Sequence, residues 1–142
     1  MKIEGISKLS ATGLQTISPD RTVLEASQKL VEFNIGALPV CDSEGGLVGI
    51  ITERDILRET AKHGSEAVGN KIAGVMTRNV MTCTADDDIE TAMRIMTERR
   101  IRHLPVLANG DLVDIISIGD LVKSKLDGAN EEIRLLRDYV AS

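Results

Sequence analysis

The stretch Arg99–Asp120 reads RRIRHLPVLANGDLVDIISIGD, and it decides the fold of this chain. Two short apolar runs, Leu104–Leu107 and Leu112–Ile116, flank Asn109-Gly110. An Asn-Gly pair between such runs predicts a β-hairpin, because both residues tolerate a positive φ. The Ser-x-x-Asp sequence that follows at Ser117 is typical of a helix start. We therefore predict a hairpin followed by a helix, with a basic segment before it.

The same unit occurs earlier in the chain. Leu38-Pro39-Val40 matches Leu104-Pro105-Val106 at an offset of about 66 residues, and Asp55 matches Asp120 after the loss of one residue from the second hairpin loop. Upstream matches at the same offset pair Thr16, Asp20, Ala26, Glu32 and Ile35 with Thr82, Asp86, Ala92, Glu98 and Ile101. An internal repeat decides the architecture. Copies of roughly sixty residues bury little core alone, so we expect the two to pack together.

The composition limits the classes of function. The chain has 142 residues, a net charge of −5 and only 1% aromatic residues. An acidic chain with so few aromatic side chains is a poor candidate for binding nucleic acid. Cys41 and Cys83 show neither disulfide nor zinc spacing, and neither a membrane-length apolar run nor a signal peptide is present. We therefore expect a cytoplasmic protein without a metal site.

Periodicity and turn residues predict the elements of each copy. Ile3, Ile6 and Leu9 have helical spacing, and we expect that segment to lie on the first copy. Val23, Ala26, Leu30 and Phe33 define an inward helix face. Asn130 is expected to cap a separate amphipathic helix. The expected ranges are a strand at 16–18, a helix at 22–33, strands at 35–40 and 47–51, a helix at 53–62, a linker at 64–74, a strand at 80–83, helices at 88–99 and 119–126, and the tail helix at 131–140.

The two copies resemble a pair of CBS domains, the regulatory module named after cystathionine β-synthase. The resemblance rests on IGALPV, GIITERD, RIRHLPV and IISIGD, and it is closest to small stand-alone bacterial or organellar proteins. It implies an α/β (α+β) fold of tandem CBS domains, with two β-α-β-β-α repeats, pseudo-twofold symmetry and nucleotide clefts. The implied boundaries are 7–63, 74–126 and a C-terminal helix at 127–142. Asp114 departs from the pattern, since the first copy has Gly49 there.

Thr52-x-x-Asp55 and Ser117-x-x-Asp120 allow two interpretations. As isolated motifs they are more typical of helix N-caps than of ligand sites. The resemblance to CBS domains implies instead that each aspartate accepts hydrogen bonds from a ribose diol, with Thr52 or Ser117 beside the sugar and phosphate. A carboxylate suits a pair of hydroxyls, because its two oxygens both accept. We favour the ligand site on the resemblance and include the neighbouring Arg54.

Arg99, Arg100, Arg102 and His103 form a basic segment that the first copy lacks. Cations in the last turn of a helix are favoured by the helix dipole, which would account for one of them. Arg102 and His103 lie at the start of a strand, where that reason does not apply. We interpret the segment as the phosphate-binding side of a site, because guanidinium groups match phosphate oxygens.

The resemblance also implies which further residues line each cleft. Thr16 and Ser18 are grouped with Asp120, and Thr82 and Thr84 with Asp55, because one copy lines the cleft whose aspartate belongs to the other. Taken singly, these residues are more typical of strands and turns. The apolar residues expected beside the adenine are Val23, Ala37, Ile50 and Ile115, which could equally be core.

The acidic run Asp86-Asp87-Asp88 is better explained by Asp88 as an N-cap than by a metal. No P-loop, GxGxxG or GxSxG sequence is present. We therefore expect a non-catalytic sensor that binds AMP, ATP or NAD(H), forms a homodimer and regulates a partner protein. The alternatives are a ligand-free scaffold for a partner protein and, with less support, an enzyme that uses Arg102 and His103 on a phosphate ester.

Overall fold

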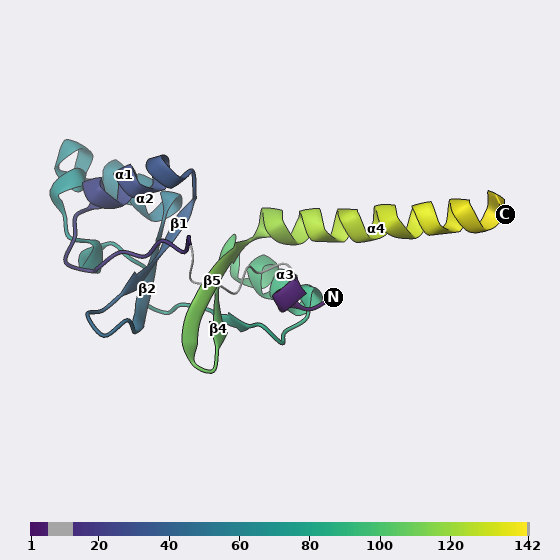
Figure 1. Ribbon diagram of the computed structural model, residues 1–142. Helices are drawn as coiled ribbons and strands as arrows, with labels where there is room; N and C mark the ends of the chain where they lie inside the picture. Colours follow the sequence, from purple (N-terminus) through teal and green to yellow (C-terminus); the bar gives the residue numbers. More distant parts are fainter. Residues whose placement is uncertain (6–12, 142) are drawn as a thin grey trace.

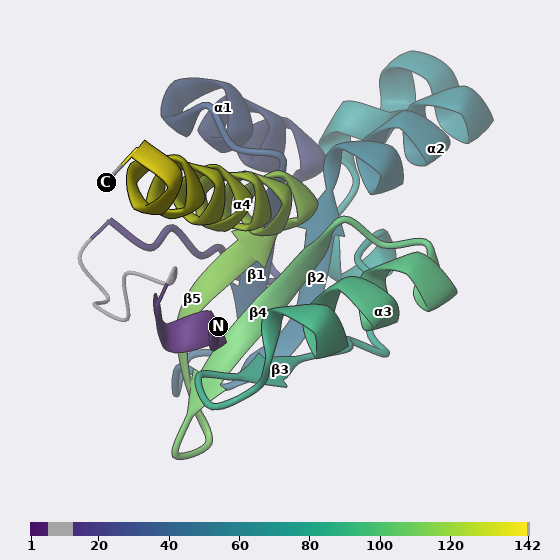
Figure 2. The same cartoon turned by 90° about the vertical axis from the view of Figure 1, so that its right-hand side faces the viewer.

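The computed structural model describes residues 1–5 and 13–141, and it contains two similar units. The two hairpins lie side by side at the centre, with helices on the outer sides (Figures 1 and 2). The first unit contains α1 (Val23–Phe33), β1 (Ala37–Cys41), β2 (Leu47–Thr52) and α2 (Glu53–His63). The second contains β3 (Cys83–Thr84), α3 (Ile89–Arg99), β4 (His103–Ala108), β5 (Asp111–Ser117) and α4 (Ile118–Ala141). The mixed helix and strand fold of two repeats is confirmed.

Each hairpin is antiparallel and carries one irregularity. Ala37 pairs with Thr52 in the first unit, and His103 pairs with Ser117 in the second. The strand expected before the first helix is short in both copies. It is a single parallel bridge from Ile17 to Val40 in the first unit and the two-residue β3, parallel to β4, in the second.

Each unit has its own hydrophobic core. In the first unit α1 and the linker pack on the hairpin, and in the second α3 and the start of α4 do the same. Aliphatic side chains supply both cores, as the lack of aromatic residues requires. The fully or almost fully buried side chains include Leu38, Val40, Ile51 and Ile72 in the first unit and Met96, Leu104, Val106, Ile116 and Leu121 in the second.

Two predictions about packing are wrong. Phe33 is 42% exposed rather than inward, because α1 ends in a left-handed turn at Asn34 immediately after it. The described start of the chain, residues 1–5, packs on the second unit. Ile3 is fully buried in the second core, and its N–H donates to the Asp87 carbonyl over 2.9 Å. Ile6 and Leu9 lie outside the described residues.

The segment between the repeats is folded and packed. It contains the 3₁₀ turns η2 (Gly64–Gly69) and η3 (Ile72–Gly74), and Ala67 and Ile72 are fully buried. The chain then crosses β2. There the Ile50 N–H donates to the Thr77 carbonyl over 3.0 Å, and the Thr77 N–H donates to the Ile50 carbonyl over 2.9 Å. This crossing brings residues 77–81 to the space between the units.

The C-terminal region forms one helix, so the predicted break before Glu131 is wrong. Asn130 lies inside α4 and caps nothing. The helix begins on the second unit, where Leu121 is buried and Lys125 pairs with Glu90 at 3.3 Å, and its distal half extends away from the body (Figure 1). Within residues 1–5 and 13–141, no helix is long and apolar enough to span a membrane.

Candidate functional site

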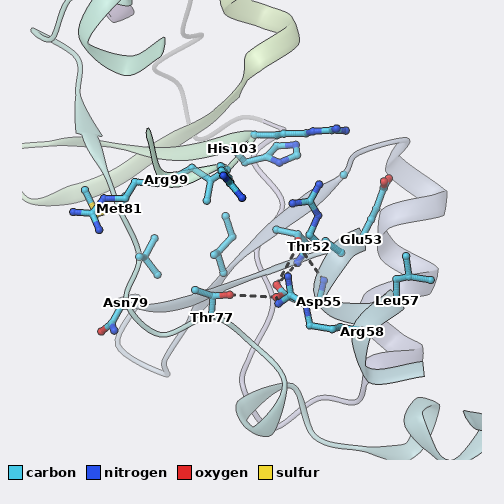
Figure 3. Close-up of a pocket in the computed structure, with 17 residues that line it drawn as sticks. Thr52, Glu53, Asp55, Leu57, Arg58, Thr77, Asn79, Met81, Arg99 and His103 are labelled. Carbon is cyan, nitrogen blue, oxygen red and sulfur yellow. Dashed lines mark hydrogen bonds and ion pairs between the residues drawn. The ribbon is translucent and has the colours of Figure 1, made fainter. Parts of the chain in front are cut away.

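A cavity of about 440 Å³ lies between the two units. The first unit contributes the end of β2 and the first turns of α2, including Thr52 and Asp55. The second contributes the connection from α3 to β4, and the chain that crosses β2 closes a third side with Val80 and Met81. Figure 3 shows Asp55 and Thr52 on one side, with His103 and Arg99 across from them. We call this space the Asp55 cavity.

Asp55 both caps α2 and borders the cavity. Its Oδ2 accepts from the Thr52 N–H over 2.9 Å and from the Thr52 hydroxyl over 3.1 Å, and the Asp55 N–H donates to Thr52 Oγ1 over 3.3 Å. The helix-capping role, one of the two interpretations of this motif from the sequence, is therefore present. The second oxygen, Oδ1, accepts from the Thr77 hydroxyl over 3.2 Å and lies 3.9 Å from the Arg58 guanidinium. A carboxylate oxygen can accept two hydrogen bonds, so Oδ1 retains capacity for a ligand hydroxyl.

The basic segment enters the cavity through a left-handed turn. Arg100 is the C-cap of α3 with a φ of 55°, and its N–H donates to the carbonyls of Met96 and Thr97. The same turn in the first unit uses Asn34, a residue that tolerates this conformation better. After the turn, Arg102 immediately precedes β4 and His103 is its first residue, and both line the cavity. A cation therefore occupies a backbone position where the other copy has a neutral residue.

His103 sits where the two units touch. A Cβ added at Gly36 would lie 3.2 Å from both Cε1 and Nε2 of the His103 ring, so a larger residue at this position would require the imidazole to shift. Burial lowers the pKa of His103, and the carboxylates of Glu53 and Asp120 partly oppose that effect. The imidazole is therefore neutral at pH 7 until an anion is placed beside it.

The cavity is cationic. Its lining carries five arginines against two carboxylates, those of Glu53 and Asp55. Apolar side chains complete the lining. Such a lining favours an anionic ligand with one flat apolar part. The arginines are Arg54, Arg58, Arg99, Arg100 and Arg102, and the apolar residues include Ile50, Val80, Met81 and Ile101.

The Asp55 cavity brings together one part of the predicted site residues, namely Ile50, Thr52, Arg54, Asp55, Arg99, Arg100, Arg102 and His103. Sequence reasoning missed Gly36, Arg58, Thr77 and Asn79. Arg58 lies one helical turn after Asp55, and that spacing was a usable signal. Thr77 and Asn79 had no such signal, because they lie between the predicted linker at 64–74 and the predicted strand at 80–83.

Other predicted site residues lie elsewhere. Val23 and Ala37 are buried in the first unit, and Thr84 is exposed. Thr82, grouped with Asp55 from the sequence, lines instead a separate hollow of about 430 Å³ beside the hairpin ends. The predicted residues outside the Asp55 cavity are Thr16, Ser18, Val23, Ala37, Thr82, Thr84, Ile115, Ser117 and Asp120.

Asp120 repeats the capping geometry of Asp55 in a more open setting. Its Oδ2 accepts from the Ser117 N–H over 2.9 Å, its own N–H donates to Ser117 Oγ over 3.1 Å, and it is exposed. Asp114, the departure from the repeat, is half-buried, and its Oδ1 accepts from the Ile115 N–H over 2.8 Å.

The acidic run before α3 differs from its predicted role in one detail. Asp88 occupies the N-cap position, but its side chain makes no capping bond. The N–H of the next residue, Ile89, donates to the Met1 carbonyl over 3.0 Å. Among the residues that the structure describes, no group of three or more His, Cys, Asp or Glu side chains is placed to hold a metal ion.

Comparisons with known proteins agree with the repeat. The family model described as CBS domain matches residues 6–62 and 72–127. An uncharacterised 17.7 kDa protein of Acidianus ambivalens is 36% identical over 86% of this chain and 73% of its own length. The crystal structure of the CBS-domain protein ATU1752 from Agrobacterium tumefaciens is 40% identical, with a TM-score of 0.77 over 79% of this chain and 84% of that one.

The structural neighbours include ligand complexes. The CBS domain pair of protein MJ0100 was crystallised with 5′-methylthioadenosine and S-adenosylmethionine. It is 28% identical to this chain, with a TM-score of 0.74 over 87% of this chain and 98% of that one. Both of its ligands contain adenosine.

Proposed function

The chain belongs to the CBS domain family, and from this premise we propose that it is a non-catalytic regulatory module that binds an adenine nucleotide in the Asp55 cavity. The proposal rests on one observation above all. The Asp55 cavity is lined by a carboxylate whose Oδ1 accepts one hydrogen bond from Thr77, by arginines from both units and by apolar side chains. A nucleotide has the matching parts, since it joins a flat base, a diol and an anionic tail.

Each part of the ligand has a proposed contact. Oδ1 of Asp55 accepts a ribose hydroxyl, which is a charge-assisted hydrogen bond. Arg99, Arg100 and Arg102 bind phosphate oxygens, and His103 joins them once it is protonated. The base lies against the apolar residues of the lining. The adenosine ligands of the MJ0100 domain pair support the base and the sugar.

The charge of the cavity favours AMP, ATP or NAD(H) over S-adenosylmethionine. Five arginines against two carboxylates leave an excess of positive charge around the ligand. A sulfonium group would add a further positive charge there, whereas a phosphate would neutralise part of the excess. We propose an energy-sensing role on this basis, in a cytoplasmic protein that acts through a second copy of itself or a regulated partner protein.

The second candidate is a scaffold that binds no nucleotide. One observation favours it, since both Asp55 and Asp120 already form N-terminal helix caps, a role that needs no ligand. On this hypothesis Arg99 and Arg100 are only solvated charges at the end of α3, where the helix dipole favours cations.

A thermal-shift panel separates the two functions. The protein is heated with AMP, ADP, ATP, NAD, NADH and S-adenosylmethionine in turn. A nucleotide present at about one hundred times its Kd should stabilise the fold by about 2.7 kcal/mol. We expect a shift with at least one phosphate-bearing nucleotide and a smaller one with S-adenosylmethionine. An unchanged melting temperature with all six would contradict the proposal and favour the scaffold.

A further inference from the structure

Helix α4 exposes a continuous apolar stripe. The side chains that form it recur at alternating spacings of four and three residues, which is the a/d pattern of a two-stranded coiled coil. Every residue from 129 to 141 is exposed, so nothing in the described part of the chain covers the distal half of the stripe. The stripe consists of Val122, Leu126, Ala129, Ile133, Leu136 and Val140.

The helix face opposite the stripe is polar. Arg134 donates there to Glu131 and to Asp138, which lie one turn before and one turn after it. Such pairs stabilise an exposed helix surface. The helix carries five acidic and four basic side chains, so it lacks the excess of cations that attracts an amphipathic helix to an anionic membrane. The stripe therefore fits a protein surface better than a lipid surface.

The stripe is accessible along its whole length. The first turns of α4 contact the body through a different side, which carries Leu121 and Lys125. On that side Leu121 is buried and Lys125 pairs with Glu90, whereas Val122 and Leu126 are 42% and 59% exposed. A second helix can therefore approach from the base of α4 to its tip.

We propose that the stripe binds α4 of a second copy of this chain, and that the two helices run parallel. The charged residues that flank the stripe favour the parallel orientation over the antiparallel one. In a parallel pair, Glu132 lies beside Arg137 of the second copy, and the twofold axis makes this ion pair twice. An antiparallel pair with the same overlap places Glu132 beside Glu132 and Lys123 beside Arg137. Like charges at these positions oppose that orientation.

Pairing of α4 does not require the proposed nucleotide. In a single chain the distal stripe lies in water, where a helical segment as short as residues 129–141 is marginally stable without a packing partner. Pairing the two stripes buries Leu126, Ile133, Leu136 and Val140 from both copies. Burial of apolar area supplies the stabilisation, and the ion pairs supply the orientation.

Two neighbouring leucines provide a matched test. Leu136 lies on the stripe, whereas Leu135 is 54% exposed but lies off the stripe. Sedimentation velocity should show a dimer for the wild-type chain and for Leu135→Glu. Leu136→Glu should raise the dimer dissociation constant at least about tenfold, since each dimer loses two buried leucines. A monomeric wild-type chain, or a Leu136→Glu chain that dimerises like the wild type, would overturn the proposal.

Charge reversal tests the orientation. Glu132→Lys or Arg137→Glu alone should raise the dissociation constant about threefold, because each creates like-charge contacts across a parallel pair. The double variant restores the contacts with opposite signs, so its dissociation constant should return to the wild-type value. If the dissociation constant of the double variant is no lower than that of the single variant that dimerises more weakly, the helices do not run parallel.

Discussion

Gly49 and Asp114 occupy the same position of the two repeats, but their surroundings differ. A Cβ at Gly49 would lie 2.6 Å from Met76 Sδ and 2.9 Å from the Thr77 carbonyl oxygen. The close approach of Met76 and Thr77 to β2 therefore requires a glycine at position 49. The sequence alone showed only that the two copies differ at this position. Because Thr77 also donates to Asp55, this close approach helps to build the cavity.

Replacement of Gly49 by alanine should destabilise the fold. The added methyl group must displace backbone at Thr77, and overpacking of this kind costs about 1–3 kcal/mol. Urea unfolding monitored by circular dichroism measures the loss. Gly74→Ala is the control, since nothing lies within 4 Å of a Cβ there and its change should stay below about 0.5 kcal/mol. Equal stabilities of the two variants would contradict the crowding at Gly49.

His103 makes the stability depend on pH. Burial lowers its pKa in the folded state, so the unfolded chain binds the proton more readily. This contribution to stability is present above the ordinary histidine pKa of about 6.5 and is lost as the pH falls through and below that value. The free energy of unfolding should therefore fall less between pH 7.5 and pH 5.5 in His103→Gln than in the wild type. Identical pH profiles of the two proteins would show that His103 is not buried as described.

At the scale of elements, local pattern predicted most of the fold. The Asn-Gly turn at Asn109, the cap at Thr22 and the repeat placed the hairpins and the helices α1, α2 and α3 to within a few residues. Local pattern did not predict the long-range packing. Neither the burial of Ile3 in the second core nor the crossing of β2 by Thr77 has a local signal.

The same limit explains the partial prediction of the site. Asp55 and the basic segment from Arg99 to His103 were found because they lie at fixed positions relative to regular elements. Thr82 was placed in that cavity by analogy, whereas the structure puts Val80 and Met81 there. Which residues of an irregular segment face a cavity depends on how that segment packs, and no periodicity encodes it.

Helix α4 gives a prediction at the element scale. Gly128 lies in its interior, with nothing within 4 Å of an added Cβ. Gly128→Ala should stabilise the helix by about 0.5–1 kcal/mol, because alanine loses less backbone entropy there. Hydrogen exchange of the amides from 128 to 134 should slow accordingly. Unchanged exchange would indicate the break in the helix that the sequence pattern had predicted near Asn130.

At the scale of the molecule, the cavity and α4 are joined by one hydrogen bond. The Ile118 N–H at the start of α4 donates to the Arg102 carbonyl over 2.8 Å. A phosphate that shifts Arg102 therefore acts on the first turn of the helix whose stripe we assign to dimerisation. Coupling of this kind is reciprocal, since each equilibrium must change the other by the same factor.

The nucleotide should consequently change the dimer dissociation constant. Sedimentation velocity with and without saturating nucleotide measures the change, and a titration of nucleotide into dilute and concentrated protein should show the reciprocal change in affinity. The Leu136→Glu chain serves as the uncoupled control, because its nucleotide affinity should not depend on protein concentration. Equal dimer constants with and without the nucleotide would mean that the two sites are independent.

The most direct test of the Asp55 cavity is calorimetric titration of the nucleotide that gives the largest thermal shift. Asp55→Asn and Asp120→Asn change matched helix caps, but only Asp55 lines the cavity. We predict that Asp55→Asn weakens binding at least about tenfold through the loss of a charge-assisted bond, while Asp120→Asn stays within about twofold of the wild type. Unchanged affinity in Asp55→Asn, or a loss confined to Asp120→Asn, would contradict the account.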